Sequence, residues 1–363
     1  MAWATPKFSR GAVNRAGDFL VNEQSILQNY AQAEDFDGLV QRLDDEYAVI
    51  NNWRASHSYP LQCMKMTLKN RAIEIDPNAV IAQRLKRLSS IAAKLERFPN
   101  MKFSQMQDIG GCRAVVSDVN QVRQLVAVYE ESWKKNPNAR MEFSEKYDYM
   151  IDPKADGYRG VHLVYKYRTQ SPDRKVYNGL RIEIQLRSYL QHAWATAVEI
   201  VSTVTGQQLK SNIGTDDWKR FFLLMSSAIA LREESPTVPN TPPTKVETRA
   251  ELHRLDQRLN IAQVLSAYST IINQVPEMVA AGFAHYLVVL DSETRQTTIT
   301  SYRKEDLAEA SEEYLRIEKS MGGQSTKQAV LASVDSVAAL HKAYPNYFLD
   351  TKEFIKVFRE VLK

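Results

Sequence analysis

The stretch "LRIEIQLR", residues 180–187, constrains the fold of this chain more than any other feature. Polar and apolar residues alternate along it, and side chains two positions apart on a strand point to the same face. The polar face carries four side chains, Arg181, Glu183, Gln185 and Arg187. The stretch therefore predicts a strand whose apolar face packs on a core and whose polar face meets water or a site.

The segments around this strand predict a sheet with helices packed on it. Short apolar runs predict further strands at 111–117, 144–151 and 160–168. Apolar residues at helical spacing predict helices over 11–57, 78–97 and 118–134, and another that starts near Ser188. The expected fold class is α/β (α+β), with a mixed, mostly antiparallel sheet flanked by helices.

A proline-rich segment divides the chain. Residues 234–246, "ESPTVPNTPPTKV", hold four prolines and three threonines, which is typical of a linker. After it come a helix at about 247–273, a hairpin in "HYLVVLDSETRQTTITSY", a helix at 304–319, a strand in "AVLAS" and two helices. We predict a first domain over 1–233, a linker over 234–246, and a second, small α+β domain over 247–363.

Bulk properties fit a soluble protein with a sizeable core. The 363 residues suffice for two domains, and 44% are hydrophobic and 25% charged. No apolar run approaches the roughly 18 residues of a membrane span, and the start "MAWATPKFSRG" lacks a signal peptide's apolar stretch. Cys63 and Cys112 lack metal-ligand spacing. We expect a cytoplasmic protein without membrane contact, disulfides or thiolate metal sites.

The first of four charged patches is "QRLKRLSSIAAKLERF", expected on a helix. Its basic side chains are Arg84, Lys86, Arg87, Lys94 and Arg97. Arg84, Arg87 and Lys94 share one face of such a helix. They form either a solvated helix face or a cradle for polyphosphate, where arginine offers a planar fork and lysine a point charge.

The second patch is "MQDIGGCRAVV". Asp108 precedes two glycines at a strand start, where a phosphate can approach the backbone, which suits a Mg²⁺ ligand. On the strand, Arg113 points away from the side of Cys112. The alternative is a turn aspartate followed by an edge arginine.

The third patch is "DYMIDPKADGYRGVH", residues 148–162. Gly157 lets the loop bend toward a ligand, and Tyr158 offers a face for a base, worth about 1–3 kcal/mol. Lys154 and Arg159 are candidates for holding phosphates, and His162 for positioning or deprotonating a hydroxyl. The alternative is a surface loop with a core tyrosine.

The fourth patch is the alternating strand with the helix after it. Glu183, between two arginines, is a candidate Mg²⁺ ligand or base, and His192 and Glu199 share one face of the following helix. A solvated sheet face explains the same alternation. Together the four patches suit phosphoryl or pyrophosphoryl transfer, which needs positioning and charge neutralisation. The chain has no GxxxxGK[ST] and no GxGxxG, so side chains would hold the nucleotide.

In order and spacing the patches resemble the synthetase domain of the RelA/SpoT family over roughly residues 40–205. The matching motifs are R-x-K-x-x-x-S-I-x-x-K-L at 84–95, D-I-x-G-x-R at 108–113, D-Y-x-x-x-P-K-x-x-G-Y-R-x-x-H at 148–162 and E-I-Q-L-R at 183–187. The resemblance implies transfer of the β,γ-diphosphate of ATP to a ribose 3′-hydroxyl, with Mg²⁺. No "HD" dipeptide of the family's hydrolase occurs, so we expect synthesis only.

The resemblance also implies roles for individual residues. Arg84, Lys86, Lys94 and Arg113 would bind ATP, with an arginine stacked on adenine. Asp108 and Glu183 would hold the metal, and the catalytic set would be Glu183, Asp108 and His162. The acceptor would lie on Tyr158, Lys154, Arg159 and Gln185. Asp156 stands where the family often has Asn, which puts acceptor preference in question.

The start "FSRGAVNRAGDFL" and the tail's "YPNY" resemble CapRel-type fused toxin–antitoxins. This implies a synthetase that modifies the 3′-CCA end of tRNA, a tail whose Tyr344 and Tyr347 mask the adenine pocket, and release by a phage protein. The alternatives are core packing for "YPNYF", an inactive nucleotide sensor, and a (p)ppGpp or (p)ppApp synthetase, which would make a soluble nucleotide product from ATP plus GTP or from ATP alone. "MKMTLKNR" and "WKKNPNAR" are candidate basic surfaces for tRNA.

Overall fold

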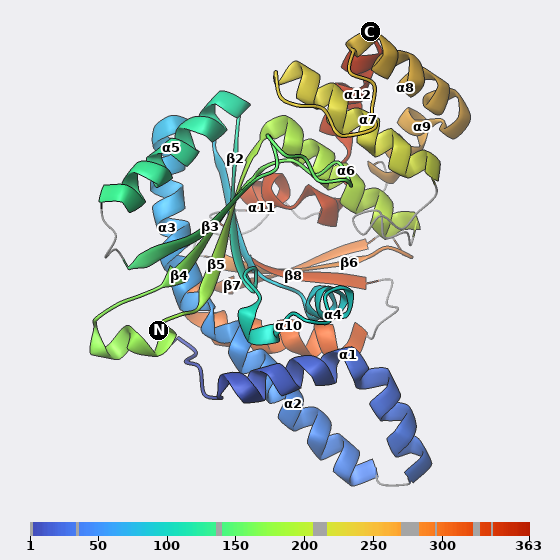
Figure 1. Ribbon diagram of the computed structural model, residues 1–363. Helices are drawn as coiled ribbons and strands as arrows, with labels where there is room; N and C mark the ends of the chain where they lie inside the picture. The colour runs from blue at the N-terminus through green and yellow to red at the C-terminus, as the bar shows by residue number, and fades with distance from the viewer. Residues whose placement is uncertain are drawn as a thin grey trace.

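An eight-stranded sheet is the centre of the computed structural model (Figure 1). Its strand order is β3-β4-β5-β2-β1-β8-β6-β7. β2 runs parallel to β5, and the other paired strands are antiparallel. The strands are β1 (Val80–Leu85), β2 (Gly110–Val116), β3 (Met141–Asp148), β4 (Val161–Tyr167), β5 (Arg181–Ser188), β6 (Phe283–Asp291), β7 (Gln296–Arg303) and β8 (Lys327–Ser333). The predicted mixed, mostly antiparallel α+β fold is confirmed.

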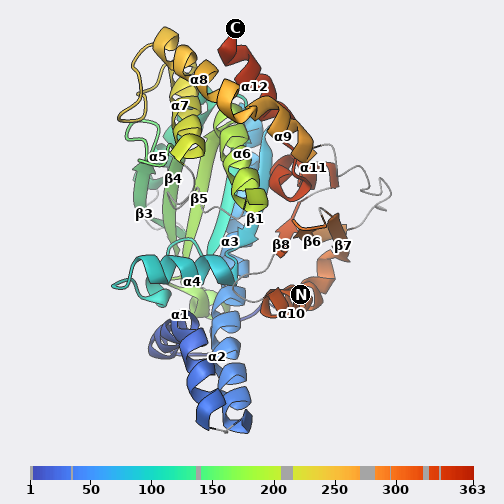
Figure 2. The same cartoon turned by 90° about the vertical axis from the view of Figure 1, so that its right-hand side faces the viewer.

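The structure describes residues 3–33, 36–135, 140–205, 216–269, 283–294, 296–321, 327–334 and 337–363. The helices are α1 (Arg10–Ala33), α2 (Phe36–Ser56), α3 (Ser58–Ile75), α4 (Leu88–Arg97), α5 (Val119–Lys135), α6 (Tyr189–Thr205), α7 (Asp216–Arg232), α8 (Lys245–Leu259), α9 (Ile261–Ser269), α10 (Leu307–Met321), α11 (Val337–Ala343) and α12 (Lys352–Leu362). The pair α1–α2 projects from one end of the molecule, and α7, α8 and α12 gather at the other (Figure 2). None of the described helices is long and apolar enough to cross a membrane.

The two faces of the sheet have different partners. On one face, α3 and α5 cover the apolar side of the central strands, including Ile182, Ile184 and Leu186 of β5. On the other face, α6 and the segment from α11 to Phe348 pack against β1 and β8 through Ile200, Ala82 and Ala332. The polar side of β5 therefore points to the face that holds α6 and α11.

The helix predicted over 78–97 is wrong in its first half. Residues Val80–Leu85 form β1, and the helix starts at Leu88. β1 lies between β2 and β8: it pairs with β2 along its whole length and with β8 at Arg84, which lies opposite Ala332. The pairing with neighbouring strands overrides the helical spacing of the apolar residues Ile81, Leu85, Leu88, Ala92 and Leu95. Arg84 is therefore on a strand, while Lys94 is on the helix.

Other predicted boundaries also shift. The helix predicted over 11–57 is divided into α1 and α2, and α3 follows at once. The one over 247–273 breaks at Asn260, which has a left-handed φ of 49°, and residues 270–273 lie outside the described residues. The strand predicted at 144–151 is β3, displaced toward Met141, because the Asp148 side chain accepts hydrogen bonds from the backbone of the following turn.

The segment after the proline-rich stretch shares its sheet and core with the first part of the chain. β8 pairs with β1, Arg84 lying opposite Ala332, and Phe354 and Phe358 pack against Phe221 of α7. The proline-rich stretch is itself held in place, since Val238 is buried and its N–H donates to Ser227 Oγ at 3.0 Å. Whether 247–363 folds as a separate domain stays a prediction.

Candidate active site

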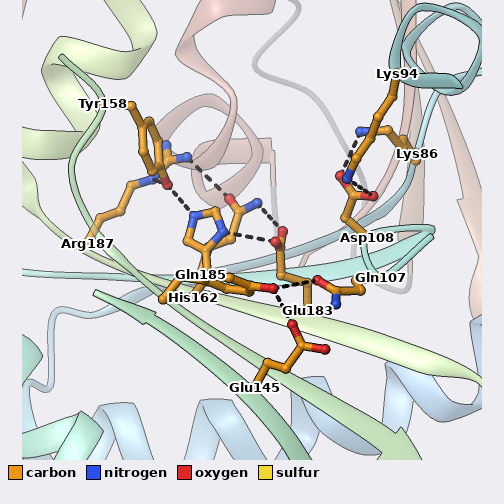
Figure 3. Close-up of polar contacts among 11 residues, drawn as sticks. Lys86, Lys94, Gln107, Asp108, Glu145, Tyr158, His162, Glu183, Gln185 and Arg187 are labelled. Atoms are coloured by element: carbon orange, nitrogen blue, oxygen red, sulfur yellow. Dashed lines mark hydrogen bonds and ion pairs between the residues drawn. The ribbon is translucent and has the colours of Figure 1, made fainter. Parts of the chain in front are cut away.

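Two charged clusters lie on the polar face of the sheet (Figure 3). We call the first the histidine network: Tyr158, His162, Glu183, Gln185 and Arg187. We call the second the lysine cluster: Lys86, Lys94 and Asp108. All four sequence patches contribute residues to the histidine network and the lysine cluster, and the two clusters are adjacent, since the charge of Glu183 acts on Asp108.

The histidine network is a chain of hydrogen bonds across β4 and β5. His162 Nδ1 lies 2.9 Å from Glu183 Oε1, and His162 Nε2 lies 2.6 Å from the Tyr158 hydroxyl. Gln185 Nε2 donates to Glu183 Oε2 at 2.6 Å. Arg187 Nε donates to the Tyr158 hydroxyl at 3.1 Å. Glu183 and His162 are about nine-tenths buried. Their side chains are therefore held in place by the protein itself, without a ligand.

These contacts shift the protonation of the network. Burial disfavours the imidazolium, but Glu183 and Tyr158 outweigh it and raise the pKa of His162 to about 9. Burial would raise the pKa of the Tyr158 hydroxyl, but Arg187 and His162 lower it to about 8. The pKa of Glu183 lies well below its usual value, because His162 and Gln185 outweigh its burial. At neutral pH Glu183 is a carboxylate beside a charged His162.

The loop that carries Tyr158 is shaped by glycine. Gly157 has φ 87°, and its carbonyl accepts from Ser226 Oγ at 2.6 Å. Gly160 has φ 141°, and a Cβ there would lie 3.1 Å from Leu186 O, tighter than most real contacts. Asp156 Oδ1 accepts from the Tyr158 backbone N–H at 2.9 Å, so Asp156 shapes the loop.

The predicted phosphate-holding residues of this loop separate in the structure. Lys154 is exposed, and its Nζ lies 4.2 Å from the Tyr149 ring centre and 5.0 Å from that of Tyr158. Arg159 is only 3% exposed, and its guanidinium donates to Pro236 O and Met150 O. Lys154 thus lies at the site, whereas Arg159 fixes the loop to the proline-rich stretch.

The lysine cluster joins the ends of β1 and α4 to the start of β2. Lys86 Nζ lies 2.8 Å from Asp108 Oδ2, and Lys94 Nζ lies 2.9 Å from Asp108 Oδ1. Burial raises the pKa of Asp108, but Lys86 and Lys94 outweigh it and keep that pKa below its usual value. Burial lowers the pKa of Lys86. The cluster has two cations for one acid, which suits an anionic ligand.

Three arginines next to the lysine cluster contact the C-terminal segment; we call them the arginine group: Arg84, Arg87 and Arg113. Arg113 Cζ lies 5.5 Å from the Tyr344 ring centre, and Arg113 donates to Ala343 O. Arg87 Nη1 lies 3.4 Å from the Tyr347 hydroxyl, and the Tyr344 hydroxyl donates to Gln83 O at 2.9 Å. Burial and Arg187 lower the pKa of Arg113 to about 10.

Asp108 and Glu183 fit a Mg²⁺ ion by the chemistry of their donor atoms. Mg²⁺ takes hard oxygen ligands and is often held by one or two carboxylates together with phosphates and waters. In this state the oxygens of Asp108 accept from Lys86 and Lys94, and those of Glu183 from His162 and Gln185. Across the described ranges no group of three potential metal-ligating side chains occurs.

Sequence reasoning missed some residues of the site. Arg187 received no role, although its place on the polar face of β5 was evident from the alternation. Tyr149 and Tyr147 stack in parallel, with ring centres 6.0 Å apart, at the end of β3. Of the proposed basic surfaces, Lys65 is buried and donates to Ser333 O, and Arg71 lies on the Tyr129 ring. Lys65 is therefore an internal contact, whereas Arg71 is half-buried and also donates to Ser132 Oγ.

The comparison with protein families supports the first of the two resemblances. Residues 83–201 match the family model described as "Region found in RelA / SpoT proteins". This range contains every residue of the histidine network and the lysine cluster, so it is the candidate site that carries the RelA/SpoT signature.

Individual relatives come from the same group. The chain is similar to "GTP pyrophosphokinase YjbM" of Bacillus subtilis, with 30% identity over 127 residues, which are 33% of this chain and 54% of that protein. The chain thus spans about half the length of this curated relative.

Solved structures include small alarmone synthetase 1 of Bacillus subtilis bound to its product pppGpp, at 23% identity and a TM-score of 0.41, covering 49% of this chain and 89% of that one. A GTP pyrophosphokinase family protein of Streptococcus pneumoniae has 21% identity and a TM-score of 0.40, covering 58% and 93%.

Proposed function

We propose that this chain is an ATP-dependent pyrophosphokinase, which transfers the β,γ-diphosphate of ATP to a 3′-hydroxyl. The observation that carries the proposal is the placement of the lysine cluster beside the histidine network, both within the residues that match the RelA/SpoT model. A cationic cluster neutralises a transferring diphosphate, and a buried carboxylate beside it accepts a proton from the attacking hydroxyl.

The donor nucleotide would occupy the lysine cluster and the arginine group. Lys86 and Lys94 supply point charges to the phosphates. Arg84 and Arg113 supply planar faces for the adenine. Asp108 and Glu183 would hold Mg²⁺, which supplies charge neutralisation between the phosphates. Lys86 and Lys94 are paired with Asp108 in this structure. The phosphates of ATP would therefore replace Asp108 as the partner of these two lysines.

The acceptor would lie on the histidine network. Tyr158 and Lys154 bind its base and phosphate, and Gln185 and His162 fix the carboxylate of Glu183 in one orientation. Glu183, which its low pKa keeps ionised, would accept the hydroxyl proton as that oxygen bonds to the β-phosphorus of ATP. The bond between the β-phosphorus and the α–β bridging oxygen breaks, and AMP leaves with that oxygen. His162, held charged by Glu183 and Tyr158, then stabilises the negative charge that develops around the transferred group.

For the acceptor we propose the 3′-CCA end of tRNA, so that the reaction inhibits translation. This rests on the resemblance of the chain's start and of "YPNY" to CapRel-type toxin–antitoxins. The second candidate is synthesis of (p)ppGpp or (p)ppApp from a nucleotide acceptor. It is favoured by the name of the relative, GTP pyrophosphokinase.

We further propose that the C-terminal segment inhibits the donor site. Tyr344 and Tyr347 are both buried, and they contact Arg113 and Arg87 of the arginine group. The Tyr344 ring occupies the position beside Arg113 that an adenine ring would need for stacking. A phage protein that binds the C-terminal segment would then release the inhibition.

The test is a transfer assay with γ-labelled ATP and Mg²⁺, offering bulk tRNA, GDP, GTP or AMP separately to the full chain and to its Tyr344→Ala variant. Label on tRNA, stronger in the variant, supports the toxin. Label on GDP or GTP alone makes the chain an alarmone synthetase. No transfer to any of the four contradicts the pyrophosphokinase.

A further inference from the structure

A carboxylate from the C-terminal segment contacts a second arginine, Arg54, and the start of α4. Glu318 of α10 lies with one oxygen, Oε2, 2.8 Å from Arg54 Nη2 and with the other, Oε1, 2.9 Å from the backbone N–H of Leu88. Both side chains are almost fully buried, at 4% exposure for Arg54 and 6% for Glu318. A buried charge pair of this kind is costly to desolvate unless every contact is well made.

The position of Leu88 explains why an anion is favoured there. Leu88 is the first residue of α4, and the first N–H groups of a helix have no partner within the helix. They also lie at the positive end of the helix dipole. Glu318 thus accepts from a helix N–H that has no partner within the helix, and it pairs with a buried guanidinium. Proteins use the same two groups to bind phosphate.

Two arginines lie close enough to Glu318 to respond to its charge. The field of Glu318 acts on both Arg54 and Arg87, while Glu199 is the acid 3.7 Å from Arg87. Removing Glu318 leaves two arginines with one acid. A cavity of about 240 Å³ is lined by Arg54, Asn52 and Ser311 among others, but by neither Glu318 nor Leu88. An anion that replaces Glu318 would therefore meet two arginines, one of which also lines this cavity.

Arg54 also ties this place to the candidate active site. Its Nε donates to Lys86 O at 3.0 Å, so it holds the turn between β1 and α4. That turn carries Lys86 of the lysine cluster and Arg87 of the arginine group. Whatever occupies the place beside Arg54 lies at the base of the proposed donor site.

We propose that Arg54 and the N-terminus of α4 at Leu88 form an anion-binding site, which Glu318 fills in this state and a phosphate group fills when α10 moves away. The proposal that this phosphate is part of a nucleotide rests on the proposed function. The proposal that the site binds phosphate is independent of the proposed function. The C-terminal segment thus occupies the donor region twice, with an aromatic ring at Arg113 and with a carboxylate at Arg54.

The test is anion rescue in the full chain, with inorganic phosphate as the probe. Glu318→Ala empties the site, Glu318→Gln fills it with a neutral amide of the same shape, and Glu313→Ala removes an exposed acid of the same helix that pairs with Arg316. The thermal unfolding midpoint of each variant and of the unchanged protein is measured in chloride and in phosphate at equal ionic strength. Nucleotide and catalysis are not involved, so the result is independent of the proposed activity.

We expect phosphate to raise the midpoint of Glu318→Ala by several degrees more than that of Glu313→Ala, and Glu318→Gln to show no such excess because its amide blocks the site. Equal phosphate effects in Glu318→Ala and Glu313→Ala overturn the proposal, as does an equal excess in Glu318→Gln. If Glu318→Ala folds only in phosphate, the proposal is supported. If it folds in neither salt while Glu313→Ala folds in both, the pair with Arg54 is a structural tie and the proposal fails.

Discussion

The histidine network and the arginine group differ in where their partners come from. Tyr158, His162, Glu183 and Arg187 satisfy one another, and the partners lie within 29 positions along the chain. Arg113 and Arg87 instead contact Ala343 and Tyr347, which lie 230 and 260 positions away. The proposed acceptor side is thus assembled by β4, β5 and the loop before β4, whereas the proposed donor side is completed by the C-terminal segment. The proposed control by that segment would therefore act on the donor nucleotide and leave the acceptor side in place.

The largest effect is expected from Glu183→Gln in the Tyr344→Ala background. If Glu183 accepts the proton, the rate of diphosphate transfer falls by about 10²–10⁴-fold, while the fold is retained because the amide keeps the shape of the carboxylate. The matched control is Glu145→Gln, which changes a neighbouring acid bonded to Tyr147 rather than to His162. Full activity in Glu183→Gln would remove Glu183 from the catalytic set.

Tyr344→Ala tests the other side of the comparison. It should raise the transfer rate at low ATP concentration by about tenfold or more, since tenfold corresponds to only about 1.4 kcal/mol of competing contact. Deleting a buried aromatic ring also destabilises the fold by about 3–5 kcal/mol.

Phe348→Ala therefore serves as the control for Tyr344→Ala. Phe348 is equally buried but packs on His341, with ring centres 4.5 Å apart. Both variants lose stability, and only Tyr344→Ala should gain ATP affinity, measured by isothermal titration. An equal gain in both variants would mean that general loosening, rather than the ring at Arg113, opens the donor site. These point changes also avoid deleting residues from 240 onward, which would strip β8 from the edge of β1.

The pH dependence of stability examines the histidine network by itself. The folded-state pKa of His162 is raised from 6.5 to about 9, so its charge stabilises the fold fully below pH 6.5, and that contribution is lost as the pH rises through about 9. A shift of this size corresponds to roughly 3 kcal/mol.

The measurement is the free energy of unfolding in urea, for the unchanged protein and for His162→Gln, from pH 6 to pH 10. The difference between the two proteins should be largest at pH 6 and shrink toward pH 10. Tyr158, whose pKa is lowered to about 8, acts in the opposite sense, so the same series in the Tyr158→Phe background separates the two groups. A difference that is constant with pH would show that His162 is neutral in the network.

The smallest effect is expected from Lys154→Ala. Its exposed ammonium lies over the Tyr149 and Tyr158 rings, and an exposed cation–π contact is worth about 0.5–1 kcal/mol. The KM for the acceptor should therefore rise about two- to fivefold, with the KM for ATP unchanged. Lys146→Ala, which removes a surface lysine paired with Glu130, is the control. A change in the KM for ATP instead would show that Lys154 contributes to binding of the donor rather than of the acceptor.

The sequence predicts the local parts of this site well and its distant parts poorly. Alternation along β5 places Glu183, Gln185 and Arg187 on one face, because a period of two leaves no other choice. It does not predict β1, since Val80–Leu85 is apolar enough for helix or strand and only the neighbouring strands decide. The contacts of Glu318 and of Arg159 could not be predicted from the sequence either. Each contact joins segments that lie far apart along the chain, and no local pattern encodes their proximity.

The pairing of β1 with β8 also has a consequence for synthesis of the protein. The backbone carbonyl of Gln83 on β1 accepts a hydrogen bond from Tyr344, which is synthesised 261 positions later. At the usual rate of about 5–20 residues per second, the ribosome needs roughly 10–50 s to make that stretch. Until then the outer side of β1 is an open strand edge, which other chains can pair with. Neighbouring nascent chains on one messenger RNA expose the same edge together, so the speed of elongation sets how long each remains open to pairing with the next.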